Sequence, residues 1–324
     1  MSPITNTKSL IRQSSPLPVD ESGSWLIKFE ELVEKSYKGN GGLPVIIICH
    51  SYGCPFVHYF LTERLEEGWK NRYVRGLIGI AGAWAGNFHA LYKYISTEPH
   101  DLLSNLVPGI TKVERTFTSN IFLLPRANLW KGEALIRTKH RNYTANDVEE
   151  VLYASNNDGR WFDVLSHNSK SWDRFLAPGT DMHCISGRGI QTPATLVLDT
   201  DYWDPAAGVV RVEKADGDGC LLLRTQSSCQ VWKEETESSG HEFSYREMNL
   251  NHMQLIQDNE AISYVIKLIR SMSGEPGAWR RRDPEQEVHD SPSRGNRPPA
   301  EQQLIPKQHF TRTPLVRVGV RWTP

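Results

Sequence analysis

Short, fully apolar runs alternate with amphipathic stretches along most of this 324-residue chain. The run from Val45 to Cys49 is rich in β-branched residues, which favours a buried strand, and the stretch Pro55–Leu65 behind it has helical periodicity. The same reasoning predicts strands at Tyr73–Ala81, Asp181–Ser186 and Glu242–Leu250, and helices at Trp25–Tyr37 and Gln254–Arg270. Strands that alternate with helices predict an α/β fold around a parallel sheet.

The first predicted strand ends in the turn His50-Ser51-Tyr52-Gly53. A buried strand, a tight turn with a serine and a following helix form the nucleophile elbow of an α/β-hydrolase, which exposes the serine hydroxyl. The backbone N–H of Tyr52 would then face the developing oxyanion. The alternative is an ordinary strand followed by a helix that Ser51 caps.

Two further residues complete the order that α/β-hydrolases require, which is serine, acid, histidine. Asp218 lies in Asp216-Gly-Asp218-Gly219, and His252 follows the strand predicted at Glu242–Leu250. Ser51, Asp218 and His252 are therefore the predicted catalytic triad. Asp218 could instead be a turn residue, and His252 a capping or core histidine. A calcium loop is disfavoured, because no glutamate follows Asp218 at the required spacing.

Several motifs in order along residues 20 to 270 make a more specific comparison. The chain resembles the lecithin:cholesterol acyltransferase and lysosomal phospholipase A family. Besides the elbow, the matching stretches are Gly82-Ala-Trp84-Ala-Gly86, Phe122-Leu-Leu-Pro-Arg-Ala-Asn-Leu-Trp130, Asn142-Tyr-Thr144, His183-Cys184-Ile-Ser-Gly187, Thr192-Pro193, Asp216-Gly-Asp218-Gly219, Ser228-Cys229-Gln-Val-Trp232 and Asn251-His252-Met253. The family has Thr-Val after the glycine that follows its acid, where this chain has Cys220-Leu221.

The resemblance implies an α/β-hydrolase core at residues 20–270, with a cap inserted at residues 88–180. It also implies an acyl-serine intermediate formed from a glycerophospholipid at a lipoprotein or membrane surface. Water as acceptor would make the enzyme a phospholipase, and a lipophilic alcohol would make it an acyltransferase. Two alternatives stay open, namely an inactive lipid-binding fragment or pseudoenzyme and a general carboxylesterase. Aromatic residues of the cap would face lipid or form the cap's own core.

The resemblance further implies a disulfide between Cys184 and Cys229, which would close a loop around Asp218. Asn142-Tyr-Thr144 fits the pattern of an N-glycosylation acceptor. Both features are typical of a secreted or lysosomal protein. Residues 1–19 form a separate amino-terminal segment in this interpretation, and they show no signal-peptide pattern.

The position of the elbow is unusual for the fold, because only the helix at Trp25–Tyr37 is predicted before it. We therefore expect that the family's first strands and second oxyanion loop are missing, through truncation or an incomplete gene model. The alternative is a naturally minimal hydrolase. On the truncated reading, the 324 residues as written are expected to have little esterase activity. Residues 271–324 are rich in proline and arginine and are predicted to be a disordered tail.

Composition excludes several other classes of function. With 39% hydrophobic residues and a net charge of −1, the chain can form a sizeable core and has no basic excess for nucleic acid. No apolar run reaches the roughly 20 residues of a membrane span. The sequence contains no His-Glu-x-x-His or Cys-x-x-Cys motif and no phosphate loop, so neither a metal nor a cofactor is predicted.

Overall fold

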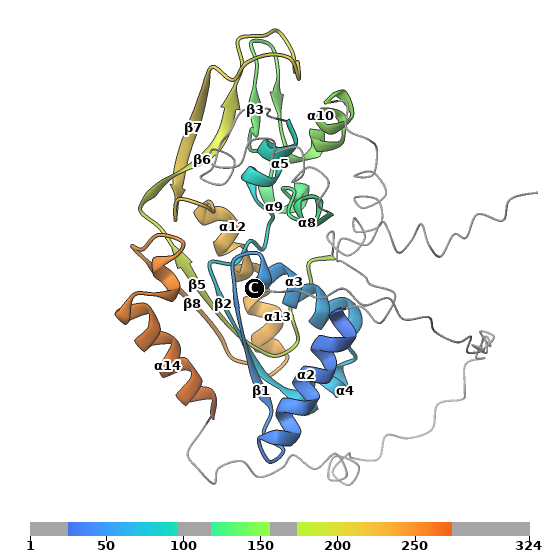
Figure 1. The fold of residues 1–324 in the computed structure, drawn as a ribbon, viewed down its shortest axis with the longest axis vertical. Helices are drawn as coiled ribbons and strands as arrows, with labels where there is room; N and C mark the ends of the chain where they lie inside the picture. Colours follow the sequence, from blue (N-terminus) through green and yellow to red (C-terminus); the bar gives the residue numbers. More distant parts are fainter. Residues whose placement is uncertain (1–24, 96–117, 156–173, 274–324) are drawn as a thin grey trace, which may run out of the picture. The chain divides into compact units, whose positions relative to one another are not determined.

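The computed structural model describes residues 25–95, 118–155 and 174–273, whose strands form two four-stranded sheets (Figure 1). The core sheet has the order β1-β2-β5-β8, and all of its strands are parallel. These strands are Val45–His50, Val74–Ile80, Asp181–Gly187 and Phe243–Met248. The predicted α/β fold with a parallel sheet is confirmed. The predicted amino-terminal segment and the tail beyond residue 273 lie outside the described residues.

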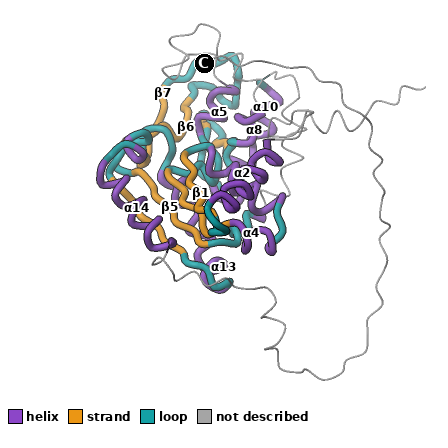
Figure 2. Tube along the Cα trace, turned by 60° about the horizontal axis from the view of Figure 1, so that its bottom comes forward, coloured by secondary structure: helices purple, strands orange, loops and turns teal. Residues whose placement is uncertain are grey.

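Helices cover both faces of the core sheet (Figure 2). Successive apolar residues of a strand pack alternately into the two hydrophobic layers between the sheet and these helices. Leu77 of β2 packs in one layer with residues of α2, Trp25–Gly39, and α3, Gly53–Tyr59. Its neighbour Ile78 packs in the other layer with α14, Asn259–Ser273. Burial on both sides explains why β2 is almost entirely apolar, whereas β8 is mostly half-buried and carries Ser244, Arg246 and Glu247. The remaining helices of the core are α4, Glu67–Tyr73, α12, Leu223–Ser227, and α13, Lys233–Ser238.

Two predicted helices differ from the structure at their ends. The helix expected at Pro55–Leu65 begins at Gly53 and changes after Tyr59 into a π-helical turn, Phe60–Arg64. The helix expected at Gln254–Arg270 is divided into a 3₁₀ turn, Gln254–Ile256, and α14. The division has a local cause, because Asp258 Oδ1 accepts hydrogen bonds from the backbone N–H groups of Glu260 and Ala261 and so caps α14.

The second sheet belongs to a unit that we call the cap module, made of residues 88–95, 118–155 and 190–217. Its sheet has the order β4-β3-β6-β7, with strands Asn142–Tyr143, Ile136–Arg137, Ile190–Val197 and Arg211–Gly217. Its helices are α5, Phe88–Ile95, α8, Thr118–Phe122, α9, Ala127–Trp130, and α10, Val148–Ala154, with a 3₁₀ turn at Ala145–Asp147. Strands β6 and β7 lie beyond residue 180, where the cap was expected to end.

The cap module has its own hydrophobic core. Phe88, Phe122 and Trp130 are each at most 2% exposed and pack there with aliphatic residues of β3 and β6. These three aromatic side chains therefore stabilise the module rather than line an open surface. Within the described ranges, no helix is both long and apolar enough to cross a bilayer.

Candidate active site

Ser51 occupies a strained turn at the carboxyl end of β1. Its φ angle is +55°, in the left-handed region that residues other than glycine seldom adopt. The conformation is held by neighbouring strand ends, since Ser51 N donates to Ile80 O at 3.0 Å and Ala83 N donates to Ser51 O at 3.3 Å. A strained residue that its surroundings hold in place is typical of functional sites.

The hydroxyl of Ser51 is hydrogen-bonded to His252 and does not cap the helix that follows it. Its Oγ lies 2.8 Å from Nε2 of His252, while no side chain caps the amino terminus of α3. Ser51 is therefore not the N-cap that the alternative interpretation of this turn required. Tyr52 stands at the N-cap position, and its ring lies 6.4 Å from that of Phe122 in the cap module. Burial raises the pKa of the Tyr52 phenol to about 12, so this side chain stays neutral.

The acid reaches the site through the hairpin of β6 and β7. Strand β5 ends at Gly187, β6 starts at Ile190 and β7 returns antiparallel to it, with Ile190 paired to Gly217. The return brings Asp218 back to the end of the core sheet from which the hairpin departed. The hairpin is thus an excursion from a single strand end, and the residue that follows it is placed beside Ser51 and His252.

The side chain of Asp218 is 1% exposed as a residue and fully engaged. Its Oδ1 accepts the backbone N–H groups of Cys220 at 2.9 Å and Leu221 at 2.7 Å. Its Oδ2 lies 2.7 Å from Nδ1 of His252. Thr192 Oγ1 accepts the N–H of the neighbouring Gly219 at 2.8 Å and so fixes the same turn. One carboxylate oxygen therefore holds the loop through two backbone N–H groups, and the other faces the imidazole of His252.

His252 forms hydrogen bonds within the site through both its side chain and its backbone. The Nδ1–H donates to the Asp218 carboxylate, which leaves Nε2 to accept the Ser51 hydroxyl. Its backbone N–H donates to Asp218 O at 2.9 Å. His252 is 9% exposed. The structure thus brings the three residues predicted from the sequence into one hydrogen-bonded line, in the arrangement that lets a histidine take a proton from a serine.

Close packing near Asp218 explains why residue 187, the last of the motif His183-Cys184-Ile-Ser-Gly187, is glycine. A Cβ at Gly187 would meet Leu250 O at 2.6 Å and Asp218 Cβ at 2.7 Å. The Gly187 N–H donates to Oε1 of the buried Gln226, whose Nε2 donates to the carbonyl oxygens of Gly187 and Leu221. Gln226 therefore links the end of β5 to residues 218–221, which we call the acid loop.

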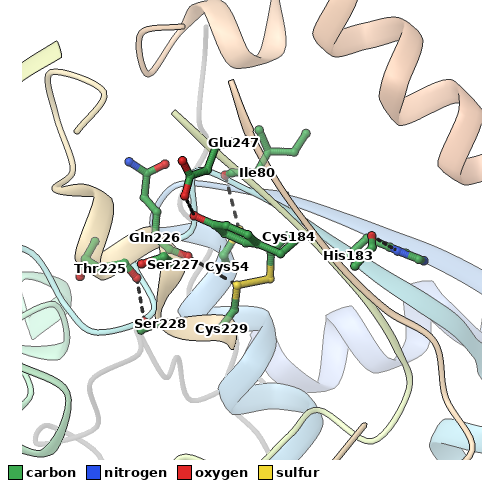
Figure 3. Close-up of a disulfide and its surroundings, with 12 residues drawn as sticks. Cys54, Ile80, His183, Cys184, Thr225, Gln226, Ser227, Ser228, Cys229 and Glu247 are labelled. Atoms are coloured by element: carbon green, nitrogen blue, oxygen red, sulfur yellow. Dashed lines mark hydrogen bonds between the residues drawn. A yellow bond between two sulfur atoms is a disulfide. The ribbon is translucent and has the colours of Figure 1, made fainter. Parts of the chain in front are cut away.

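A disulfide links β5 to the segment that follows the loop of Asp218 (Figure 3). It joins Cys184 on β5 to Cys229 in the 3₁₀ turn Ser228–Trp232, with Cα atoms 6.9 Å apart. The predicted disulfide is confirmed, and the 45-residue separation between its cysteines includes Asp218. Cys49, Cys54 and Cys220 are free thiols.

The roles of three residues near the site were missed in the sequence analysis. Gln226 carries no local signal, and Thr192 was noticed only as part of the matching stretch Thr192-Pro193, because the roles of both depend on contacts between segments far apart in the chain. His50 precedes the predicted nucleophile directly and could have been noticed for that reason. Asn142, the predicted glycosylation acceptor, is exposed on β4, and its modification stays a prediction. In the part of the chain that the structure describes, no group of three or more His, Cys, Asp or Glu residues could hold a metal ion.

Comparison with known proteins places the chain near lipid acyltransferases. The family model described as "Lecithin:cholesterol acyltransferase" matches residues 12–172, a stretch that includes Ser51 and ends before Asp218 and His252. Lysosomal phospholipase A and acyltransferase of Rattus norvegicus is 24% identical over 254 residues, covering 77% of this chain and 59% of that protein. The Homo sapiens protein of the same name gives the same identity and coverage.

A second group of relatives is similar to the chain at comparable identity. Phosphatidylcholine-sterol acyltransferase of Mus musculus is 28% identical over 243 residues, covering 74% of this chain and 53% of that protein. The chain spans between half and two thirds of the length of these relatives. The family model and both groups of relatives agree, and the chain is similar to the lecithin:cholesterol acyltransferase family.

Proposed function

We propose that the chain carries the catalytic centre of a serine-dependent acyltransferase or phospholipase that acts on glycerophospholipid. Ser51 is the nucleophile, His252 the general base and acid, and Asp218 the residue that orients His252. The names of the relatives support the reaction class, since they combine phospholipase A with acyltransferase activity and phosphatidylcholine with a sterol. The observation that carries the proposal is the hydrogen-bonded line from Ser51 through His252 to Asp218.

In the first half-reaction, Ser51 Oγ attacks the ester carbonyl carbon of the phospholipid while its proton moves to Nε2 of His252. The carbonyl oxygen becomes an oxyanion, toward which the backbone N–H of Tyr52 donates. Asp218 stabilises the imidazolium through the Nδ1–H bond of 2.7 Å. The tetrahedral intermediate collapses when His252 passes the proton to the leaving lysophospholipid oxygen, and an acyl-serine remains.

In the second half-reaction, an acceptor hydroxyl attacks the acyl-serine, and His252 removes the acceptor's proton. Water as acceptor releases a fatty acid, and a lipophilic alcohol gives a new ester. His252 then returns the proton to Ser51 Oγ. The same three residues serve both outcomes, so the acceptor decides whether the reaction is hydrolysis or transfer.

The test uses the 324-residue protein with phosphatidylcholine vesicles, with and without a sterol, and follows lysophospholipid, fatty acid and sterol ester. In line with the little activity expected from the sequence, we expect a low rate of lysophospholipid release, which Ser51→Ala abolishes. Asp218→Asn should lower the rate about 10⁴-fold, because the wrong tautomer of the histidine is then favoured. Asp199→Asn is the matched control, since that carboxylate is exposed and pairs with Lys139 in the cap module. It should leave the rate unchanged.

The other outcomes of this test separate the alternatives. Vesicle binding without turnover, and without reaction at Ser51, would identify a lipid-binding pseudoenzyme and contradict the proposal. Turnover of small soluble esters with none of phosphatidylcholine would identify a general carboxylesterase.

A further inference from the structure

His50, the residue before Ser51, contacts His252 in two ways. Its Nε2–H donates to the backbone carbonyl oxygen of His252 at 3.1 Å. The two imidazole rings also lie against each other, with centroids 4.6 Å apart and planes inclined by 42°. Because a carbonyl oxygen can only accept, the bond fixes the proton of neutral His50 on Nε2. His50 therefore engages both the main chain and the ring of the residue that accepts the Ser51 hydroxyl.

The hydrogen bond from His50 holds the turn that carries His252 in place. It runs along the surface, where Met253 is 49% and Ile256 is 38% exposed. Leu255, at 1% exposure, anchors its far end in the core, and the bond from His252 N to Asp218 O anchors its start. Exposed turns with few buried contacts open locally at low free-energy cost. The bond from His50 adds an attachment at the catalytic residue itself.

We propose that His50 is a positioning residue that keeps His252 aligned with Ser51, an inference that rests on the proposed function. His50 and Ser51 are consecutive, so the strand end that carries the nucleophile also holds the backbone of the base. A displacement of the elbow then moves both ends of the 2.8 Å bond between Ser51 Oγ and His252 Nε2 together. Small misplacements of reacting groups are costly in rate, which is why this coupling matters.

The electrostatics of His50 fit this task. Burial lowers its pKa, an effect that the charge of His252 reinforces and that the bond to the His252 carbonyl and the charge of Asp218 oppose. These two residues, one from the histidine turn and one from the acid loop, are the titratable groups that act on His50. At neutral pH its ring carries no charge that would oppose the imidazolium formed on His252 during the reaction.

Three substitutions separate the hydrogen bond from the ring. His50→Gln places an amide donor near the position of Nε2, His50→Asn has a shorter amide that does not reach, and His50→Phe keeps a ring without a donor.

The readout is the labelling of Ser51 by a fluorophosphonate, with its maximal rate separated from the half-saturating concentration. We expect the maximal rate to fall about tenfold in Phe and Asn variants at an unchanged half-saturating concentration, and to stay within roughly threefold in the Gln variant. His140→Phe, in an exposed turn of the cap module, is the matched control and should label like the wild type.

A second readout does not depend on chemistry at Ser51. In protein labelled with ¹⁵N-histidine, solvent exchange of the His252 Nδ1–H should be faster in the Asn and Phe variants and unchanged in the Gln variant. Wild-type labelling and exchange in both the Asn and Phe variants would overturn the proposal, as would equal losses in Gln and Asn. If Ser51 does not label in the wild type while the exchange pattern holds, the proposed function fails and the positioning role stands. Should the Phe variant not fold, the comparison of Gln with Asn decides.

Discussion

At the scale of single residues, Gly187 shows how closely the acid loop is packed against the core sheet. A methyl group there would need space that Leu250 O and Asp218 Cβ occupy. We predict that Gly187→Ala displaces Asp218 and lowers Ser51 labelling by at least about tenfold, because the acid no longer orients His252. Gly208→Ala is the control, since nothing lies within 4 Å of its Cβ position. Labelling of Gly187→Ala at the wild-type rate would show that the loop is not constrained as described.

His58 makes a second prediction at this scale, which concerns stability. It is buried, stacks on Trp232 with ring centroids 4.6 Å apart and donates from Nε2 to Leu176 O at 2.7 Å. Burial lowers its pKa to about 3, from 6.5 in the unfolded chain. Between these pH values the unfolded state binds the extra proton, so the free energy of unfolding falls as the pH falls, by about 1.4 kcal/mol per pH unit for this residue.

The pH dependence can be measured by urea unfolding at several values between pH 7 and 4. His50 and His183, whose pKa values burial also lowers, add to the wild-type slope. We expect His58→Phe to be less stable at pH 7, because it loses the bond to Leu176 O, and to lose less stability on acidification. His140→Phe should keep the wild-type slope. A slope for His58→Phe as steep as that of the wild type would mean that His58 is not held neutral.

At the scale of elements, the strands were predictable and the hairpin was not. Strands β1 and β2 are almost entirely apolar, which sequence patterns register directly, whereas β5 and β8 also carry polar residues. Strand β6 pairs with β7 on one side and with β3 on the other, so the membership of both strands in the cap module depends on contacts that no local pattern contains. The start of α14 was missed for a different, local reason, since the cap at Asp258 overrides the amphipathic pattern that begins earlier. Ser51, Asp218 and His252 could be proposed from the sequence because their motifs are local and their order is fixed, whereas Gln226 acts only through tertiary contacts.

The disulfide gives a prediction for these elements. Replacing Cys184 and Cys229 together by alanine should lower the free energy of unfolding by about 2–4 kcal/mol, because the loop between them gains freedom in the unfolded chain. Ser51 labelling should also slow, since the loop contains Asp218. Cys220→Ala, at an exposed free thiol, is the control for stability. Equal unfolding midpoints for the double variant and the wild type under oxidising conditions would contradict the bridge.

At the scale of the whole molecule, the core sheet and the sheet of the cap module both position residues of the candidate active site. The core sheet brings Ser51 and His252 to the carboxyl ends of its strands, and the cap module returns Asp218 to the same place through β7. The two units are joined by more than the hairpin, because Trp130 Nε1 of the cap module donates to Ala85 O after β2 at 2.9 Å. The site therefore depends on the integrity of both units, and a change that loosens their junction is expected to act on the acid first.

The most direct test of the central claim is peptide mapping after reaction of the 324-residue protein with a fluorophosphonate. A single adduct on the Ser51 hydroxyl is predicted, absent in Ser51→Ala and strongly slowed in His252→Gln, because only a serine with an aligned base is activated. A denatured sample of the wild type serves as control and should not react. An adduct on another residue, or labelling of Ser51→Ala as fast as that of the wild type, would contradict the account.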